Sequence, residues 1–196
     1  MNRWEIVFAC LLAGCSDELG GPGGTGDATG SGSGDATIPG GVGEPPELAG
    51  MTLYHNQIRA AVDTADPLPP LQWDPELAAY AAAWAAQCID TAAPAGLIDH
   101  NEARQGVAGY AYIGENIFGS GGAATAQGAT TTWSAEKSNY MYATNSCAGI
   151  CGHYTQIVWR ATTHVGCALQ NCAGLQYGST IVCDYGPGGN NGSSPY

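Results

Sequence analysis

The stretch from Cys147 to Tyr185 reads CAGICGHYTQIVWRATTHVGCALQNCAGLQYGSTIVCDY. It contains five cysteines and two runs rich in β-branched and aromatic residues, Tyr154–Trp159 and Ser179–Tyr185. Such runs, separated by glycine-containing turns, predict strands. His153 directly precedes the first run, so we expect its imidazole at the beginning of a strand.

Two segments of this region resemble the signatures of the CAP superfamily. They are GHYTQIVW at 152–159 and IVCDYGPGGN at 181–190. The superfamily comprises cysteine-rich secretory proteins, venom antigen 5 proteins and plant pathogenesis-related class-1 proteins. The resemblance is closest to the plant branch and continues to the terminal Ser194-Pro195-Tyr196. It implies a disulfide-stabilised, three-layer α-β-α sandwich.

Hydrophobic periodicity predicts three helices before this region. Apolar residues at spacings of three and four indicate a first helix over 48–62, ended by the prolines of 66–70. Asp74-Pro75 is typical of a helix start, and a third helix is expected over 123–140. The segment 99–114 reads as loop. Because helices and strands are segregated along the chain, we predict an α+β fold with a small antiparallel or mixed sheet.

The N-terminal residues predict an export signal. The apolar run 6–13 is too short to span a bilayer and ends in Leu12-Ala13-Gly14-Cys15, which resembles a bacterial lipobox. We expect a lipoprotein signal over 1–15, with Cys15 acylated and Ser16 favouring the outer membrane. An ordinary secretory signal is the alternative. Residues 16–46, rich in Gly, Ser and Asp, predict a flexible linker, and 47–196 the folded domain.

The cysteine count fits an exported domain. Of eight cysteines, Cys10 lies in the signal and Cys15 is the expected anchor. An even number remains, which predicts three disulfides with fifteen possible pairings. Cys147 and Cys151 are close enough to pair with each other, and their spacing does not suit a zinc ribbon. The six are Cys88, Cys147, Cys151, Cys167, Cys172 and Cys183.

Charge limits the expected partners. The formal net charge is −12 and the chain has only five Lys and Arg residues. Binding to a nucleic-acid backbone needs clustered basic residues, so we expect no nucleic-acid partner. Membrane contact is expected only through a lipid anchor at Cys15.

Four polar residues are the candidate site: His100, Glu115, Glu136 and His153. Two imidazoles and two carboxylates can form a divalent-metal site or an acid/base pair. The CAP resemblance implies that these positions meet in a central cleft, where His100 and His153 bind zinc in some members. His100-Asn101 departs from the usual His-Ser of the family. Taken singly, each residue has an ordinary structural role: Glu115 in an irregular segment could brace a turn, and Glu136 could be a solvated helix carboxylate.

Other candidate groups are assigned to structure. His55 lies on the buried stripe of the first helix, and His164 begins a strand after a turn. The cysteines are expected to be oxidised and no G-x-S-x-G motif is present, which disfavours a nucleophilic enzyme. The resemblance favours a non-catalytic extracellular module that binds a lipid, sterol or peptide, with an open, exchangeable zinc site. The alternative is a secreted hydrolase, a peptidase that depends on a metal or on a His/Glu pair.

Overall fold

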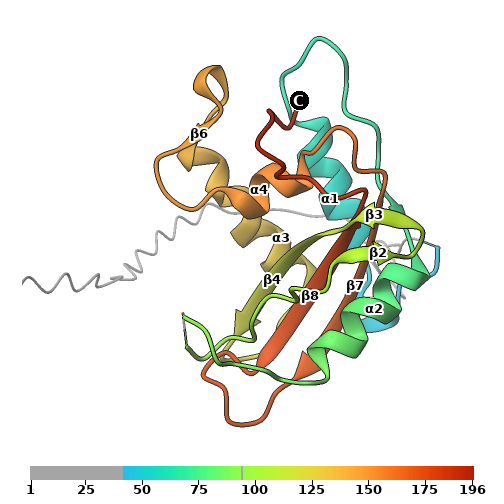
Figure 1. Cartoon of the computed structure of the whole chain (residues 1–196), viewed down its shortest axis with the longest axis vertical. Helices are drawn as coiled ribbons and strands as arrows, with labels where there is room; N and C mark the ends of the chain where they lie inside the picture. The colour runs from blue at the N-terminus through green and yellow to red at the C-terminus, as the bar shows by residue number, and fades with distance from the viewer. Residues whose placement is uncertain (1–41, 94) are drawn as a thin grey trace, which may run out of the picture. The chain divides into compact units, whose positions relative to one another are not determined.

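The computed structural model describes residues 42–93 and 95–196 (Figure 1), all within the compact unit Ala36–Tyr196. The predicted signal, its Cys15 and most of the predicted linker lie outside the described residues. No helix among the described residues is long and apolar enough to cross a bilayer.

A mixed four-stranded sheet forms the middle layer (Figure 1). Its order is β1 (Gln72–Trp73), β7 (His164–Asn171), β8 (Ser179–Gly186) and β4 (Gly114–Ser120). β1 runs parallel to β7, whereas β7 and β4 are antiparallel to β8. β4 is therefore an edge strand. Two short ribbons lie outside this sheet: β2 (Gln105–Val107) with β3 (Tyr110–Tyr112), and β5 (Tyr140–Met141) with β6 (Ser146–Cys147).

Helices cover both faces of the sheet. On one face, α2 (Pro75–Ala85) packs against β7 and β8. On the other, α1 (Met51–Ala60), α3 (Ala126–Ala135) and α4 (Gly152–Ile157) pack against one another. This arrangement confirms the predicted α+β, α-β-α sandwich. Three short 3-10 turns complete the fold: η1 (Pro46–Leu48), η2 (Glu136–Asn139) and η3 (Tyr142–Thr144).

Side-chain alternation along β8 divides the core into two parts. Ile181, Cys183 and Tyr185 face the cluster built with α1, α3 and α4, whereas Val182 faces the cluster built with α2. Asp184, two residues after Val182, therefore lies on the α2 side and is fully buried.

Carboxylate side chains cap the N-termini of two helices, α2 and α1. Asp74 Oδ1 accepts hydrogen bonds from Glu76 N and Leu77 N, as the Asp74-Pro75 sequence predicts. At α1, the Glu44 carboxylate accepts hydrogen bonds from Gly50 N at 2.9 Å and Thr52 N. Glu44, which falls within the predicted linker, thus stabilises the first turn of α1.

The residues of the first helix that were assigned to structure are indeed internal. His55 is fully buried, with Nδ1 2.8 Å from Met51 O and Nε2 2.8 Å from Tyr185 Oη. Burial lowers the pKa of His55 to about 4, so its ring is neutral. Arg59 donates to main-chain carbonyls of four residues on two other segments, and burial lowers its pKa to about 10.

α2 approaches the sheet closely at Gly166 of β7. A Cβ atom at this position would lie 2.2 Å from Ala78 N and 2.4 Å from Asp74 O. Main-chain atoms cannot give way at such distances, so the contact between α2 and β7 requires glycine.

Three disulfides join the six cysteines of the described residues, as the cysteine count predicts. They pair Cys88 with Cys172, Cys147 with Cys151, and Cys167 with Cys183. The first links the end of α2 to the turn between β7 and β8, and the third joins these two strands directly.

Two local predictions are wrong. The run Tyr154–Trp159 is not a strand: α4 occupies Gly152–Ile157, and the next strand begins only at His164. Its apolar side chains are buried against α1 and α3, and this packing overrides their β propensity. The segment 99–114 is also not all loop, since it contains the ribbon of β2 and β3.

Candidate functional site

His100 and Glu115 form the first of two imidazole–carboxylate pairs. Glu115 lies in β4 and not in an irregular segment, opposite Asp184 of β8. His100 Nδ1 is 2.6 Å from Glu115 Oε1, so this nitrogen carries the proton and donates it to the carboxylate. The same oxygen accepts a hydrogen bond from Asn101 N at 2.9 Å. The Glu115 side chain is fully buried, whereas that of His100 is 48% exposed.

The loop that carries His100 is fixed from the α2 side. Trp84 Nε1 donates to Asp99 O at 2.8 Å, and the Tyr80 hydroxyl donates to Ala103 O. The Asp99 carboxylate accepts hydrogen bonds from the Thr91 hydroxyl and from main-chain N–H groups of Thr91 and Ala92. These bonds, the Thr91 hydroxyl first, hold the pKa of Asp99 below its ordinary value.

His153 and Glu136 form the second pair. Glu136 is the C-cap residue that follows α3 and the first residue of η2, and His153 is in the first turn of α4. His153 Nδ1 is 2.6 Å from Glu136 Oε1, while Glu136 Oε2 accepts from the main-chain N–H groups of His153 at 2.9 Å and Tyr154 at 3.2 Å. Burial alone would raise the pKa of Glu136, but these hydrogen bonds and the His153 charge bring it below its ordinary value.

The two pairs meet at the free edge of β4. Glu115 faces the α2 side of the sheet, whereas the Asn116 amide beside it donates to His153 O at 3.1 Å and Tyr185 Oη at 3.0 Å on the other side. His100, Glu115 and His153 line one open cleft of about 400 Å³. Glu136 is not among the residues that line this cleft, and it is connected to the cleft through its hydrogen bonds to His153. Both pairs leave the Nε2 atom of the imidazole without a hydrogen bond among the described residues.

A second cavity adjoins this cleft. Its volume is about 600 Å³, and its lining is mainly apolar, with the aliphatic side chains of Leu97, Ile98, Ile117 and Ile150 among it. His100, Glu102, Ile150 and His153 line both hollows, so the polar cleft opens directly into the apolar cavity.

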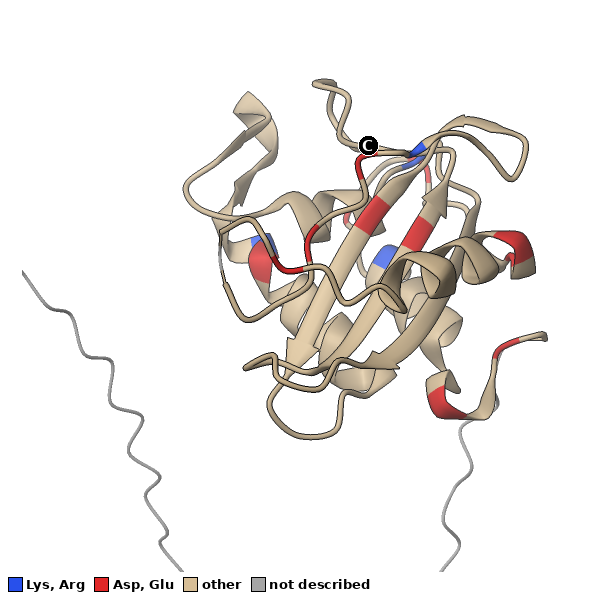
Figure 2. Cartoon of the chain, turned by 60° about the horizontal axis from the view of Figure 1, so that its bottom comes forward, with Lys and Arg blue, Asp and Glu red and all other residues tan. Residues whose placement is uncertain are grey.

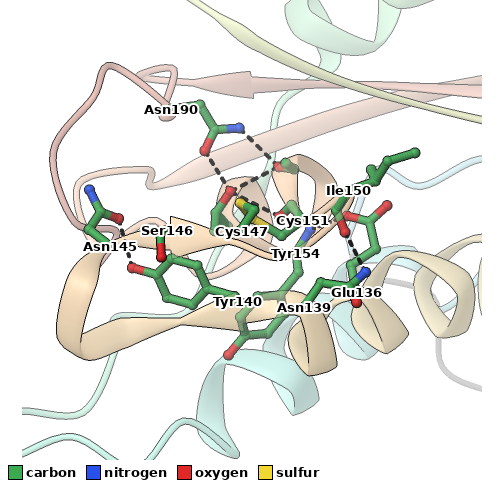
Figure 3. Close-up of a disulfide and its surroundings, with 12 residues drawn as sticks. Glu136, Asn139, Tyr140, Asn145, Ser146, Cys147, Ile150, Cys151, Tyr154 and Asn190 are labelled. Atoms are coloured by element: carbon green, nitrogen blue, oxygen red, sulfur yellow. Dashed lines mark hydrogen bonds between the residues drawn. A yellow bond between two sulfur atoms is a disulfide. The ribbon is translucent and has the colours of Figure 1, made fainter.

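Ile150 belongs to a braced loop. Asn139 Nδ2 donates to Ile150 O at 2.8 Å, and the Cys147–Cys151 disulfide closes the loop around it (Figure 3). Its side chain nevertheless remains 70% exposed at the mouth of the cleft. A fixed main chain with an exposed apolar side chain is suited to contact with a ligand.

Sequence reasoning missed Asp184. Its side chain is buried among the sheet and α2, and neither carboxylate oxygen has a hydrogen-bond partner among the described residues. Burial, and then repulsion from Glu115, raises the pKa of Asp184 to about 8, against an opposing effect of Arg104. The raised pKa depends on the position of Asp184 opposite Glu115 in the sheet. That strand register is not evident from the sequence.

The two histidines fit a metal site that keeps coordination positions open, and not a structural site filled by four protein ligands. Histidines that bind metals commonly donate their other N–H to a carboxylate, as both histidines do here. Among residues 42–93 and 95–196 no group of three or more His, Cys, Asp or Glu side chains forms a metal site. Two Nε2 atoms are therefore the available protein ligands, and water or a bound molecule would complete the coordination.

Comparison with known proteins gives consistent results. Residues 53–185 match the family described as CAP, the cysteine-rich secretory protein family. Pathogenesis-related protein 1 of Arabidopsis thaliana is 40% identical over 137 residues, covering 69% of this chain and 73% of the relative.

Solved structures agree with this match. The venom allergen-like protein 4 of Schistosoma mansoni superposes with a TM-score of 0.64 at 26% identity, over 78% of this chain and 95% of that one. NaASP2, whose structure is described as containing Zn²⁺, gives a TM-score of 0.51 at 25% identity, over 74% of this chain and 82% of that one.

Proposed function

This chain belongs to the cysteine-rich secretory protein (CAP) family, and we propose that it acts outside the cell as a binding module and not as a hydrolase. Its cleft would hold a lipid, sterol or peptide, and His100 and His153 would hold an exchangeable divalent cation such as zinc. The observation that carries the proposal is the pair of carboxylate-anchored imidazoles with both Nε2 atoms left for a ligand.

Several features favour binding over hydrolysis. The six cysteines of the described residues are all in disulfides, which removes a thiolate nucleophile. No Ser or Thr hydroxyl within the described residues is hydrogen-bonded to His100 or His153, as a serine nucleophile would require. NaASP2, whose structure is described as containing Zn²⁺, supports zinc as the divalent cation of this proposal.

Zinc calorimetry tests the metal component. The wild-type domain should bind one zinc ion per chain, and acidification should weaken binding because protons compete for the imidazoles. The double variant His100→Ala/His153→Ala should lose the site, while His164→Ala, which removes a histidine outside the cleft, should keep it. Equal binding by the double variant would place the site elsewhere.

Peptide turnover tests the hydrolase alternative. A broad peptide library incubated with the purified domain, with and without chelator, should remain intact. Cleavage that disappears in both Glu115→Ala and His153→Ala would overturn the binding proposal.

We also propose that the chain is a lipoprotein. Acylation of Cys15 would hold the domain at a bacterial membrane, supported by the Leu12-Ala13-Gly14-Cys15 sequence. Mass spectrometry of the full chain expressed in a bacterium should find an acylated Cys15 at the new N-terminus. An unmodified Cys15 would leave only secretion.

A further inference from the structure

The apolar cavity beside the cleft has the size and chemistry of a side-chain pocket. Its volume of about 600 Å³ falls in the range of small-molecule sites, and its lining is mainly apolar and includes four branched aliphatic side chains. Its walls come from the loop before His100, from β4 and from the braced loop of Ile150. It is therefore bounded by segments that are each held by hydrogen bonds or a disulfide.

The strand that borders both hollows is an edge strand. Ile113 N donates to Arg104 O, and Ile117 O accepts from Trp133 Nε1, so these two residues direct main-chain groups away from β8. By the alternation of antiparallel pairing, Glu115 between them turns its N–H and C=O in the same direction. The groups of Ile113 and Ile117 are already bound to Arg104 and Trp133. An extended peptide can therefore pair with the N–H and C=O of Glu115, whereas an acyl chain cannot.

One acidic side chain lies at the junction of the two hollows. Glu102 lines both of them, whereas Asp99 lines only the apolar cavity and Glu115 and Arg104 line only the polar cleft. Glu102 is exposed, lines both hollows, and makes no hydrogen bond or ion pair within the described part of the chain. Figure 2 shows how few basic positions accompany the acidic ones in this domain. The Glu102 carboxylate repels an anionic headgroup and attracts a cation.

We infer that the cleft binds an extended peptide along β4, with a large apolar side chain in the cavity of Leu97, Ile98, Ile117 and Ile150 and a Lys, Arg or terminal amine beside Glu102. The inference rests on the proposed binding function and names its ligand class. The polar cleft would take the peptide main chain, which has a donor and an acceptor at nearly every residue.

Affinity selection from a defined library tests the inference. The probe is a set of capped hexapeptides with Gly, Leu, Phe, Lys and Glu varied in all orders, incubated with the wild-type domain and identified by mass spectrometry. Peptides with Leu or Phe near Lys should be enriched at least tenfold over those with Leu or Phe near Glu. Raising the salt concentration should reduce this preference.

Two variants address the two halves of the site. Ala92→Trp places an indole in the apolar cavity from an exposed position, and Glu102→Lys reverses the charge at the junction. Each should weaken the best Leu–Lys or Phe–Lys peptide at least tenfold. The matched controls Ala83→Trp and Glu47→Lys, at exposed positions that line neither hollow, should stay within twofold of wild type.

Zinc calorimetry on the same proteins separates the possible failures. Ala92→Trp should bind zinc as the wild type does, because it changes neither an imidazole nor its carboxylate. Glu102→Lys, which reverses a charge in the same cleft, should bind zinc more weakly but keep the site. Zinc binding without peptide selection, or binding of a fatty acid or sterol that Ala92→Trp blocks, would overturn the peptide inference and leave the proposed function in place. Loss of zinc binding, lipid binding and peptide selection together in the wild type would overturn both.

Discussion

At the scale of single residues, Asp184 departs most from ordinary chemistry. A carboxyl group with no hydrogen-bond partner among the described residues, fully buried opposite Glu115, stays protonated in the folded chain until pH about 8. The unfolded carboxyl ionises near pH 4, so between these two pH values the folded chain binds more protons. The free energy of unfolding is therefore unaffected by ionisation of Asp184 below about pH 4. It falls as the pH rises toward 8, because the unfolded chain releases this proton and the folded chain does not.

Asp184→Asn should consequently stabilise the domain at neutral pH. The amide keeps the shape of the side chain without an ionisable proton, so the gain should be near zero at about pH 4 and on the order of 4 kcal/mol at pH 7. Urea unfolding at several pH values measures this difference, with the exposed Asp63→Asn as control. A gain that does not change with pH would show that Asp184 is ionised in the folded chain.

The four site residues could be predicted from the sequence, but their connections could not. The CAP motifs point to His100, Glu115, Glu136 and His153, and the structure brings the two histidines and Glu115 to one cleft with Glu136 behind His153. Which carboxylate holds which imidazole depends on the packing of β4 and α3, which no local pattern encodes. Asp184 was missed for the same reason, since it depends on strand register.

At the scale of elements, α4 shows the limit of local patterns. A six-residue helix gains little from propensity and depends on what surrounds it. The Glu136 carboxylate accepts from the N–H groups of His153 and Tyr154 and so serves as an N-terminal cap supplied by another element. The sequence GHYTQIVW contains no sign of this distant cap, which is why it reads as a strand.

Glu136→Ala should destabilise the domain by about 1–2 kcal/mol at neutral pH, the usual cost of losing a cap. Because the pKa of Glu136 is lowered in the folded chain, its contribution is present above the pKa of an unfolded glutamate and is lost as the pH falls through the folded value. Wild type and Glu136→Ala should therefore differ in stability at neutral pH and become similar at strongly acidic pH. Unfolding midpoints at the two pH values measure this difference. Glu47→Ala, an exposed acid on η1, should show no such change, and an equal loss at both pH values would contradict the capping role.

At the scale of the whole molecule, the disulfides differ in how much chain they constrain. Cys88–Cys172 spans 84 residues and ties the end of α2 to the far end of the sheet, whereas Cys147–Cys151 spans 4. The layered fold itself was predictable from the resemblance and the periodicity, but six cysteines alone allow many pairings. The pairing follows from where the folded chain places them.

Removing the long-range bridge should therefore cost more stability than removing the short one. From the loop lengths we expect about 4–5 kcal/mol for Cys88→Ser/Cys172→Ser and about 2 kcal/mol for Cys147→Ser/Cys151→Ser. Thermal and urea unfolding of the two double variants provide the comparison. Equal losses would indicate that native packing around the bridges, and not chain entropy, decides their contribution.

Gly166 is a single residue that affects both the packing of α2 and the position of the His100 loop. With no room for even one methyl group between β7 and α2, the helix rests directly on the sheet backbone, and the same helix holds the His100 loop through Tyr80 and Trp84. A larger residue at 166 would push α2 outward and carry His100 with it, away from His153 on the opposite layer. The span between the two ring nitrogens, and with it the size of the ion that the proposed site would hold, is thus governed by a residue that touches neither of them.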